Sequence, residues 1–135
     1  MSFKVVFDTN IFISAFAIPG GRAEEAYLLG LKGEFILYSS VPVLTEAAQK
    51  LREKFGWEEK KVIQFLRIIT RLGIIIKTQS HLHLLPDEPD NRVLECAEEA
   101  KADFVVTGDK HLLSLKHFQN TDIISLSDFL KKLSK

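Results

Sequence analysis

Two aspartates directly follow apolar runs of the sequence, where a buried strand would end. Asp8 comes after Val5-Val6-Phe7, and Asp109 comes after Val105-Val106-Thr107-Gly108. Each position suits the N-cap of a following helix, a common role for Asp. Each also suits a carboxylate that serves a ligand, because ligands of open α/β sheets bind beyond the carboxyl ends of the strands. The two positions by themselves leave both roles open.

A third carboxylate, Asp90, is predicted to point inward. In a helix over residues 87–100, the 100° step places Asp90 on the stripe of Leu94 and Ala97, which should face the sheet. An inward carboxylate needs a partner. A capping arrangement opened by Asp87 would instead turn Asp90 back toward the helix end.

A fourth carboxylate, Glu46, lies in a predicted helix on the face opposite the apolar stripe that begins at Leu44. A solvated Glu and a Glu that lines a cleft both fit this position. If Asp8, Glu46, Asp90 and Asp109 converge, their negative charges repel one another unless cations neutralise them. Hard oxygen ligands without a Cys or His cluster favour Mg²⁺ or Mn²⁺. Such ions activate a water molecule to attack a phosphodiester, so these four carboxylates indicate a hydrolytic nuclease.

These carboxylates need a sheet that brings strand ends together, and the sequence predicts one. Apolar runs alternate with amphipathic segments along the chain. The predicted strands are residues 3–7, 35–38, 74–77, 104–107 and 122–125. The predicted helices are about residues 9–17, 22–32, 39–55, 57–72, 87–100, 109–115 and 127–133. Helical crossovers require parallel strands, which predicts a single domain over residues 1–135: a three-layer α/β/α sandwich around a mostly parallel five-stranded sheet.

Composition agrees with a folded domain. The 135 residues are 46% hydrophobic and 27% charged, with 18 basic and 18 acidic side chains, which excludes a disordered chain. The N-terminal residues do not predict a signal peptide, and the longest near-apolar run, residues 11–18, is too short to cross a membrane. A single cysteine, Cys96, cannot form an intrachain disulfide, so we expect a cytoplasmic protein.

Net charge zero conceals a basic segment followed by an acidic one. Residues 47–77 carry eight basic and three acidic side chains, and residues 78–103 carry seven acidic and two basic ones. This distribution suits a phosphate polymer that approaches a metal site, although solvated helix faces would also carry such charges. Four residues are candidate RNA contacts: Arg22, Lys50, Arg52 and Lys54.

Four segments, in chain order, resemble the PIN-domain nucleases. They are Val-Phe-Asp-Thr-Asn-Ile-Phe-Ile-Ser-Ala around Asp8, the helical Glu46 after Ser39-Ser40, Pro-Asp-Asn at 89–91, and Val-Val-Thr-Gly-Asp-Lys-His-Leu-Leu at 105–113. The resemblance is closest to the single-domain, VapC-like toxin branch. It implies a Mg²⁺- or Mn²⁺-dependent ribonuclease with an RNA substrate, held inactive by an antitoxin protein.

The same resemblance implies roles for individual residues. Asp8, Glu46, Asp90 and Asp109 would be the catalytic, metal-binding acids. Three polar residues would support these carboxylates: Asn10, Ser14 and Thr107. In many relatives another acid follows two residues after the fourth. Here that residue is His111, so the sequence does not decide between one metal position and two.

The helix predicted from residue 57 to residue 72 is apolar over much of its circumference. Val62, Phe65, Leu66 and Ile69 form one face, and Ile63, Ile68 and Leu72 extend it. We therefore expect a homodimer that can also accept an antitoxin helix.

Other functions are weaker. A phosphotransferase with a nucleophilic Asp8 generally needs an acid two residues later, where Asn10 stands, and a receiver-like domain needs paired acids early in the chain. The remaining alternative is a catalytically weak RNA-binding or partner-binding module on a PIN scaffold. His81 and His83 have no third ligand nearby in the sequence, so we expect no metal there.

Overall fold

The structure, a computed structural model, describes residues 2–79 and 81–134. Its strands are β1 (Lys4–Phe7), β2 (Ile36–Ser40), β3 (Ile74–Ile76), β4 (Phe104–Val106), β5 (His117–Phe118) and β6 (Thr121–Ile124). Its helices are α1 (Thr9–Ala17), α2 (Arg22–Leu31), α3 (Val41–Glu53), α4 (Glu59–Leu72), α5 (Glu88–Ala100), α6 (Lys110–Leu115) and α7 (Leu126–Leu133). No helix within these ranges is both long enough and apolar enough to span a membrane.

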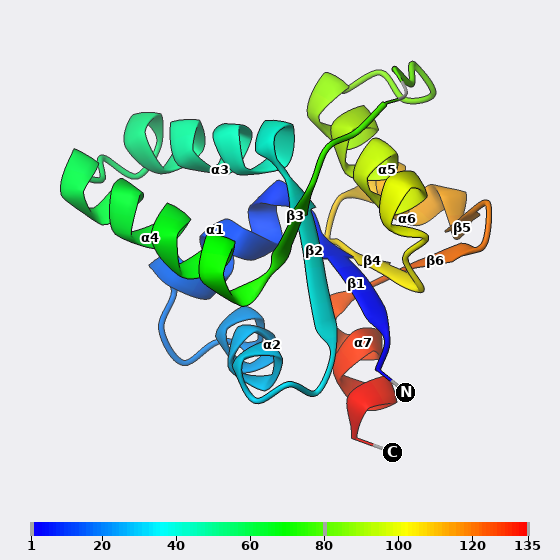
Figure 1. The fold of residues 1–135 in the computed structure, drawn as a ribbon, viewed down its shortest axis with the longest axis horizontal. Coiled ribbons are helices and arrows are strands. Elements are labelled where there is room, and N and C mark those ends of the chain that lie inside the picture. Colours follow the sequence, from blue (N-terminus) through cyan, green and yellow to red (C-terminus); the bar gives the residue numbers. More distant parts are fainter. Residues whose placement is uncertain (1, 80, 135) are drawn as a thin grey trace.

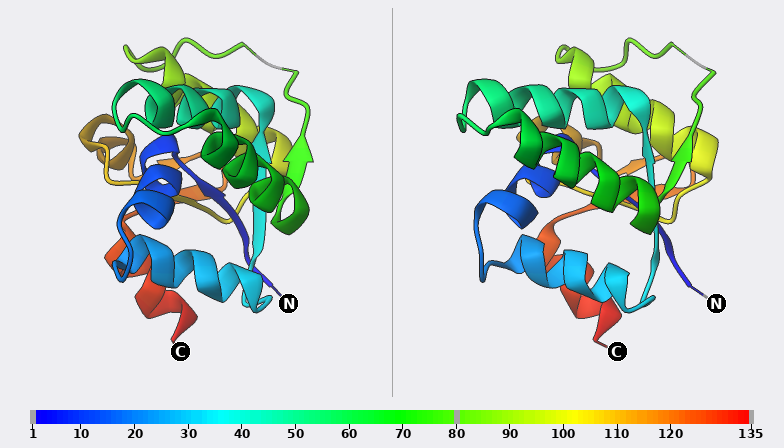
Figure 2. Two further views of the ribbon diagram at one scale, coloured as in Figure 1. Left: turned by 90° about the vertical axis from the view of Figure 1, so that its left-hand side faces the viewer. Right: turned by 60° about the vertical axis from the view of Figure 1, so that its left-hand side comes forward.

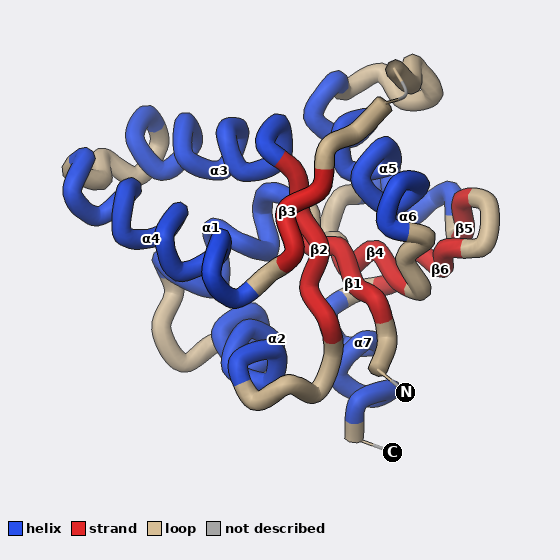
Figure 3. The backbone as a smooth tube through the Cα atoms, in the orientation of Figure 1, coloured by secondary structure: helices blue, strands red, loops and turns tan. Residues whose placement is uncertain are grey.

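The strands form one sheet in the order β3-β2-β1-β4-β6-β5, and all neighbours are parallel except β5 and β6. The sheet grows from β1 through β2 to β3 in one direction and through β4 to β6 in the other. The winding therefore reverses between β1 and β4. Figure 3 shows the strands as one central layer, with the β5–β6 hairpin at the end farthest from β3.

Helices cover both faces of this sheet. Figure 1 shows α1 to α4 on one side and α5 with α6 on the other. Helix α7 packs against α2, and the two lie side by side in both views of Figure 2. The predicted α/β/α sandwich with a mostly parallel sheet is confirmed.

The predicted strand count of five is wrong, because the sheet has six strands. The additional strand, β5, has only two residues, His117 and Phe118, and pairs antiparallel with β6. Two residues are too few to produce a period-2 pattern in the sequence. Lys116 and Gln119, which flank the strand, adopt positive φ angles of 62° and 54°, and these turns fold β5 back along β6.

Aromatic rings fill the core on the α2 and α7 side of the sheet. Phe7 of β1 lies 5.6 Å from Phe12, 5.8 Å from Phe35 and 6.3 Å from Phe129, measured between ring centroids. All four rings are buried. Tilted and edge-to-face contacts of this kind stabilise a core beyond the area they bury. They fix β1 and the residue that follows it, Asp8.

Candidate active site

The site starts where β1 and β4 end side by side. Phe7 pairs with Val106 in the parallel register, so Asp8 and Thr107 come next at the same edge. Asp8 is the N-cap of α1 and accepts a hydrogen bond from the Ile11 N–H at 2.8 Å. Its other carboxylate oxygen accepts a hydrogen bond from the Thr107 hydroxyl. Asp8 is thus both a cap and a member of the site, at the point where the winding of the sheet reverses.

Asp109 is held to the same edge by two interactions. Its backbone N–H donates to the Thr107 hydroxyl oxygen at 2.9 Å, so Thr107 contacts both aspartates. As the N-cap of α6, its Oδ1 accepts from the N–H groups of His111 at 2.9 Å and Leu112 at 3.0 Å. The Asp109 side chain also lies within hydrogen-bonding reach of the Asp90 carboxyl group.

Asp90 lies in the first turn of α5 and is buried, with 7% of its surface exposed. The alternative capping arrangement does not form, because the Asp87 side chain makes no cap hydrogen bond. Asp90 Oδ2 has no hydrogen-bond partner among the described residues. A buried carboxylate oxygen without a partner is costly, which makes this atom the most informative one in the site.

The loop that precedes α5 is held by the side chains of Asn91 and Glu95, and not by that of Asp90. The Asn91 side chain accepts from the Leu85 N–H and donates to the Leu85 carbonyl, both at 2.8 Å. Glu95, also buried, accepts from the Leu82 N–H at 2.7 Å and pairs with Arg92 at 2.8 Å. These contacts hold the loop while the Asp90 side chain faces the other aspartates.

The electrostatics reflect a crowded set of acids. Burial, followed by the charges of Asp109 and Asp87, raises the pKa of Asp90 to about 7. Burial also raises the pKa of Asp8, while the hydrogen bonds from Thr107 and Ile11 oppose that rise. A cation would relieve both effects, because it favours the ionised carboxylates.

Glu46 lies at the margin of this cluster. Its Oε1 is 3.9 Å from the Lys50 ammonium one helical turn later, and both side chains are partly exposed. The same ammonium donates a 3.5 Å hydrogen bond to Asn10 Oδ1. Glu46 therefore connects to the cluster through Lys50.

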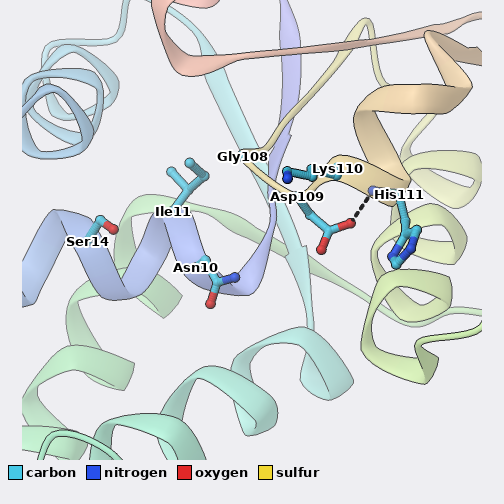
Figure 4. A pocket seen from close by; sticks show the side chains of 7 residues that line it. All are labelled: Asn10, Ile11, Ser14, Gly108, Asp109, Lys110 and His111. Atoms are coloured by element: carbon cyan, nitrogen blue, oxygen red, sulfur yellow. Dashed lines mark hydrogen bonds between the residues drawn. The ribbon is translucent and has the colours of Figure 1, made fainter.

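Two neighbouring cavities share Asn10 and Asp109 in their linings. A small one of about 30 Å³, room for one or two water-sized groups, is lined by Asp8, Thr9, Asn10, Lys50, Asp87, Pro89, Asp90, Val93 and Asp109. A wider one of about 540 Å³ is lined by Asn10, Ile11, Ser14, Gly108, Asp109, Lys110 and His111. Figure 4 shows this wider cavity between the start of α1 and the start of α6. The arrangement offers a compact cation position beside space for a larger substrate.

Lys50 lines the small cavity, whereas the described residues that line the two cavities do not include the other three candidate RNA contacts. Arg52 pairs with Glu59 through two hydrogen bonds of 2.6 and 3.1 Å. Lys54 is the exposed C-cap of α3. Arg22 is the exposed first residue of α2, a helix that packs against α1 and α7.

Sequence reasoning missed Asp87, and it named Lys50 only as an RNA contact and His111 only as a departure from the family pattern. Asp87 lines the small cavity, a position signalled by its place at the start of the same helix as Asp90. Lys50 lines that cavity as well, which no local pattern in α3 indicates. His111, noted only as a departure from the family pattern, has a ring nitrogen within 4.8 Å of carboxylate oxygens of Asp90 and Asp109.

Comparison with known proteins identifies the family. The family model described as PIN domain matches residues 4–111. The chain belongs to the PIN-domain family. The matched range includes Asp8, Glu46, Asp90 and Asp109. An uncharacterized protein of Methanocaldococcus jannaschii is 34% identical over 118 residues, which cover 84% of this chain and 75% of that protein.

Solved structures show the same PIN fold. VapBC2 from Rickettsia felis, bound to a DNA fragment from its promoter, matches with a TM-score of 0.63 and 16% identity over 90% of this chain and 98% of that one. VapC20 of Mycobacterium tuberculosis, a toxin that cleaves the sarcin-ricin loop, matches with a TM-score of 0.60 and 15% identity over 87% and 98%. The expected PIN domain with a VapC-like fold is confirmed.

Proposed function

We propose that this PIN domain is a divalent-metal-dependent endoribonuclease, the toxin of a toxin–antitoxin pair. The observation that carries the proposal is the convergence of Asp8, Asp90 and Asp109 on one small cavity, with a buried oxygen of Asp90 lacking a partner. Hard oxygen donors of this kind fit Mg²⁺ or Mn²⁺. The donor set and the unpartnered atom thus both suit a cation.

The residues around such an ion have separate tasks. Asp8, Asp90 and Asp109 would hold it, with Glu46 and Asp87 adding negative charge at the margin. When bound, a divalent ion polarises a phosphoryl oxygen and lowers the pKa of water. Thr107 orients two of the carboxylates, a positioning role that Asn10 and Ser14 would share from α1. Lys50 places a positive charge where a phosphate would enter.

The RNA substrate and the antitoxin rest on the similarity to VapC proteins and on the charge distribution. VapC20 cleaves a ribosomal RNA loop, and the wider cavity beside Asp109 has room for a nucleotide. Phosphate contacts from Lys50, Arg52, Lys54 and Arg22 would add affinity by counterion release. The VapBC2 complex supports an antitoxin that binds this chain as well.

Cleavage of a structured RNA in Mn²⁺ or Mg²⁺ tests the enzyme. Asp8→Asn should remove cleavage and leave the fold intact, because Asn still caps α1 but carries no negative charge. Glu99→Gln is the matched control, since Glu99 is an exposed acid of α5. A metal chelator should stop RNA cleavage by the wild-type protein. RNA binding without metal-dependent cleavage would instead favour the binding-module alternative.

Expression in a bacterial host tests the toxin assignment. The wild type should arrest growth, and Asp8→Asn should not. Co-expression of the neighbouring open reading frame should restore growth if it encodes the antitoxin. Unimpaired growth with abundant, folded wild-type protein would contradict a toxin role while leaving the nuclease assignment to the cleavage assay.

A further inference from the structure

His111 is fixed beside the acids by the backbone that caps α6. Its N–H donates to Asp109 Oδ1 at 2.9 Å, so the two residues keep one relative position. Figure 4 shows the Asp109 carboxylate and the His111 ring on the same side of the start of α6. The ring is exposed, whereas Asp90, which faces it from α5, is buried.

The distances suit a shared ion. One ligand atom each from Asp90, Asp109 and His111 lies within 4.8 Å of the others. Two atoms bound to one ion through bonds of about 2.1 Å lie roughly 3 to 4 Å apart. The remaining difference is small for an exposed ring, which can rotate about its two side-chain torsions.

A second observation points to a ligand at the same place. Asp90 Oδ2 is buried and has no hydrogen-bond partner among the described residues, and Asp90 lines the small cavity together with Asp109. The group nearest to hydrogen bonding with Asp90 is the Asp109 side chain, which is itself an acid. A cation between Asp90 and Asp109 would satisfy it, and His111 lines the wider cavity beside Asp109.

We propose that a ring nitrogen of His111 is a metal ligand, which together with Asp90 and Asp109 makes this site selective for first-row transition ions over Mg²⁺. This inference rests on the proposed metal-dependent function and names the ion that serves it. Mg²⁺ takes oxygen ligands and keeps its water molecules, so an imidazole adds little to its affinity. Transition ions gain from imidazole nitrogen, and affinity rises from Mn²⁺ toward Co²⁺ and Zn²⁺.

The test is metal binding without RNA. Titration calorimetry should give Mn²⁺ an affinity at least about tenfold higher than Mg²⁺ in the wild type. His111→Asn should lose about tenfold or more for Mn²⁺ and little for Mg²⁺. His111→Asp replaces the imidazole with an oxygen ligand and should reduce the difference between the Mn²⁺ and Mg²⁺ affinities. His117→Asn is the matched control, because His117 is an exposed histidine on β5.

Electron spin-echo spectroscopy of the Mn²⁺-loaded protein gives a direct readout. Modulation from a coordinated imidazole nitrogen should be present in the wild type and in His117→Asn, and absent in His111→Asn. Its absence from the wild type with Mn²⁺ bound, or an unchanged Mn²⁺ affinity in His111→Asn, would overturn the inference. A His111 that contacts only the RNA would give that result.

The outcomes separate this inference from the proposed function. If the wild type cleaves RNA with Mn²⁺ but His111→Asn binds Mn²⁺ equally well, the nuclease stands and the ligand assignment fails. If the nitrogen signal is present but no RNA is cleaved under any metal condition, the ligand assignment stands and the nuclease fails.

Discussion

Thr107, at the end of β4, donates a hydrogen bond from its hydroxyl to the carboxylate of Asp8, at the end of β1. The same hydroxyl oxygen accepts the N–H of Asp109 at 2.9 Å. Thr107 is fully buried, so neither bond competes with solvent at that side chain. One side chain thereby sets the separation between two acids that lie 101 positions apart in the numbering.

Thr107→Val should show what this hydroxyl contributes. Valine keeps the shape but leaves a buried carboxylate oxygen and a backbone N–H without their partner, which costs about 1–3 kcal/mol of unfolding free energy. Urea denaturation measures that loss, and RNA cleavage should fall because Asp8 is no longer held in place. Thr107→Ser keeps the hydroxyl and should cleave RNA at close to the wild-type rate. Equal stability of the Val variant and the wild type would contradict the role assigned to the hydrogen bonds.

Asp90 should make the metal-free protein less stable as the pH rises. Its pKa is raised to about 7 in the folded state, against about 4 in the unfolded chain, so the folded state binds the extra proton. The stabilisation from this proton is complete below pH 4 and is lost as the pH rises through 7. Asp90→Asn removes the titration, so its stability relative to wild type should increase from pH 4 to pH 8.

The measurement is chemical denaturation of both proteins in chelator across that pH range. The difference between them should reach a few kcal/mol above pH 7, on the order of the shift at about 1.4 kcal/mol per pKa unit. Glu99→Gln, an exposed change on the same helix, should follow the wild type. A wild-type-minus-variant difference in unfolding free energy that stays constant across the range would show that the pKa of Asp90 is the same in the folded and unfolded states.

The strand-end aspartates could be predicted because local sequence fixes where they lie. Asp8 and Asp109 follow buried apolar runs, and parallel strands bring such positions to one edge. The helical wheel likewise placed Asp90 on the buried face of α5. These predictions needed only the period of each element and the polarity of the sheet.

Contacts between elements could not be predicted in the same way. A wheel gives the face on which Glu46 lies, but not that Lys50 stands between it and the aspartates. The sequence suggests that Arg52 is free to bind a phosphate. In the structure, the turn between α3 and α4 brings Arg52 to Glu59, with which it forms two hydrogen bonds. Such pairings depend on how two helices cross, which neither helix encodes alone.

Lys50 should matter more to RNA binding than Arg52 or Lys54. It lines the cavity of the aspartates, while Arg52 is paired with Glu59 and Lys54 caps the far end of α3. Lys50→Gln should weaken binding and reduce the slope of log affinity against log salt by about one. Arg52→Gln should change the slope less. Filter binding with the Asp8→Asn protein, from low to moderate salt, measures both.

The triple change Lys50→Gln, Arg52→Gln and Lys54→Gln measures how much all three side chains together contribute to the salt dependence of RNA binding. Its slope should be lower than that of Lys50→Gln alone only if Arg52 or Lys54 also contacts phosphate. Identical slopes for the triple variant and the parent would assign all three side chains to solvation.

The last prediction concerns a homodimer through α4. Val62, Phe65 and Ile69 are buried in the chain itself, while Ile63 on the same helix is 42% exposed. Ile74 of the edge strand β3, directly after α4, is 46% exposed. Exposed apolar side chains on consecutive elements are typical of a surface that meets another chain.

Light scattering at micromolar concentration should give about twice the chain mass of 15.3 kDa. Ile63→Lys should shift the protein toward the monomer, because a charge at the centre of an apolar interface must be desolvated. Leu28→Lys is the matched control, since Leu28 is 45% exposed on α2. A mass of 15.3 kDa at every concentration would mean that Ile63 and Ile74 are solvent-facing in the monomer and that this surface is left for a different partner, such as the antitoxin.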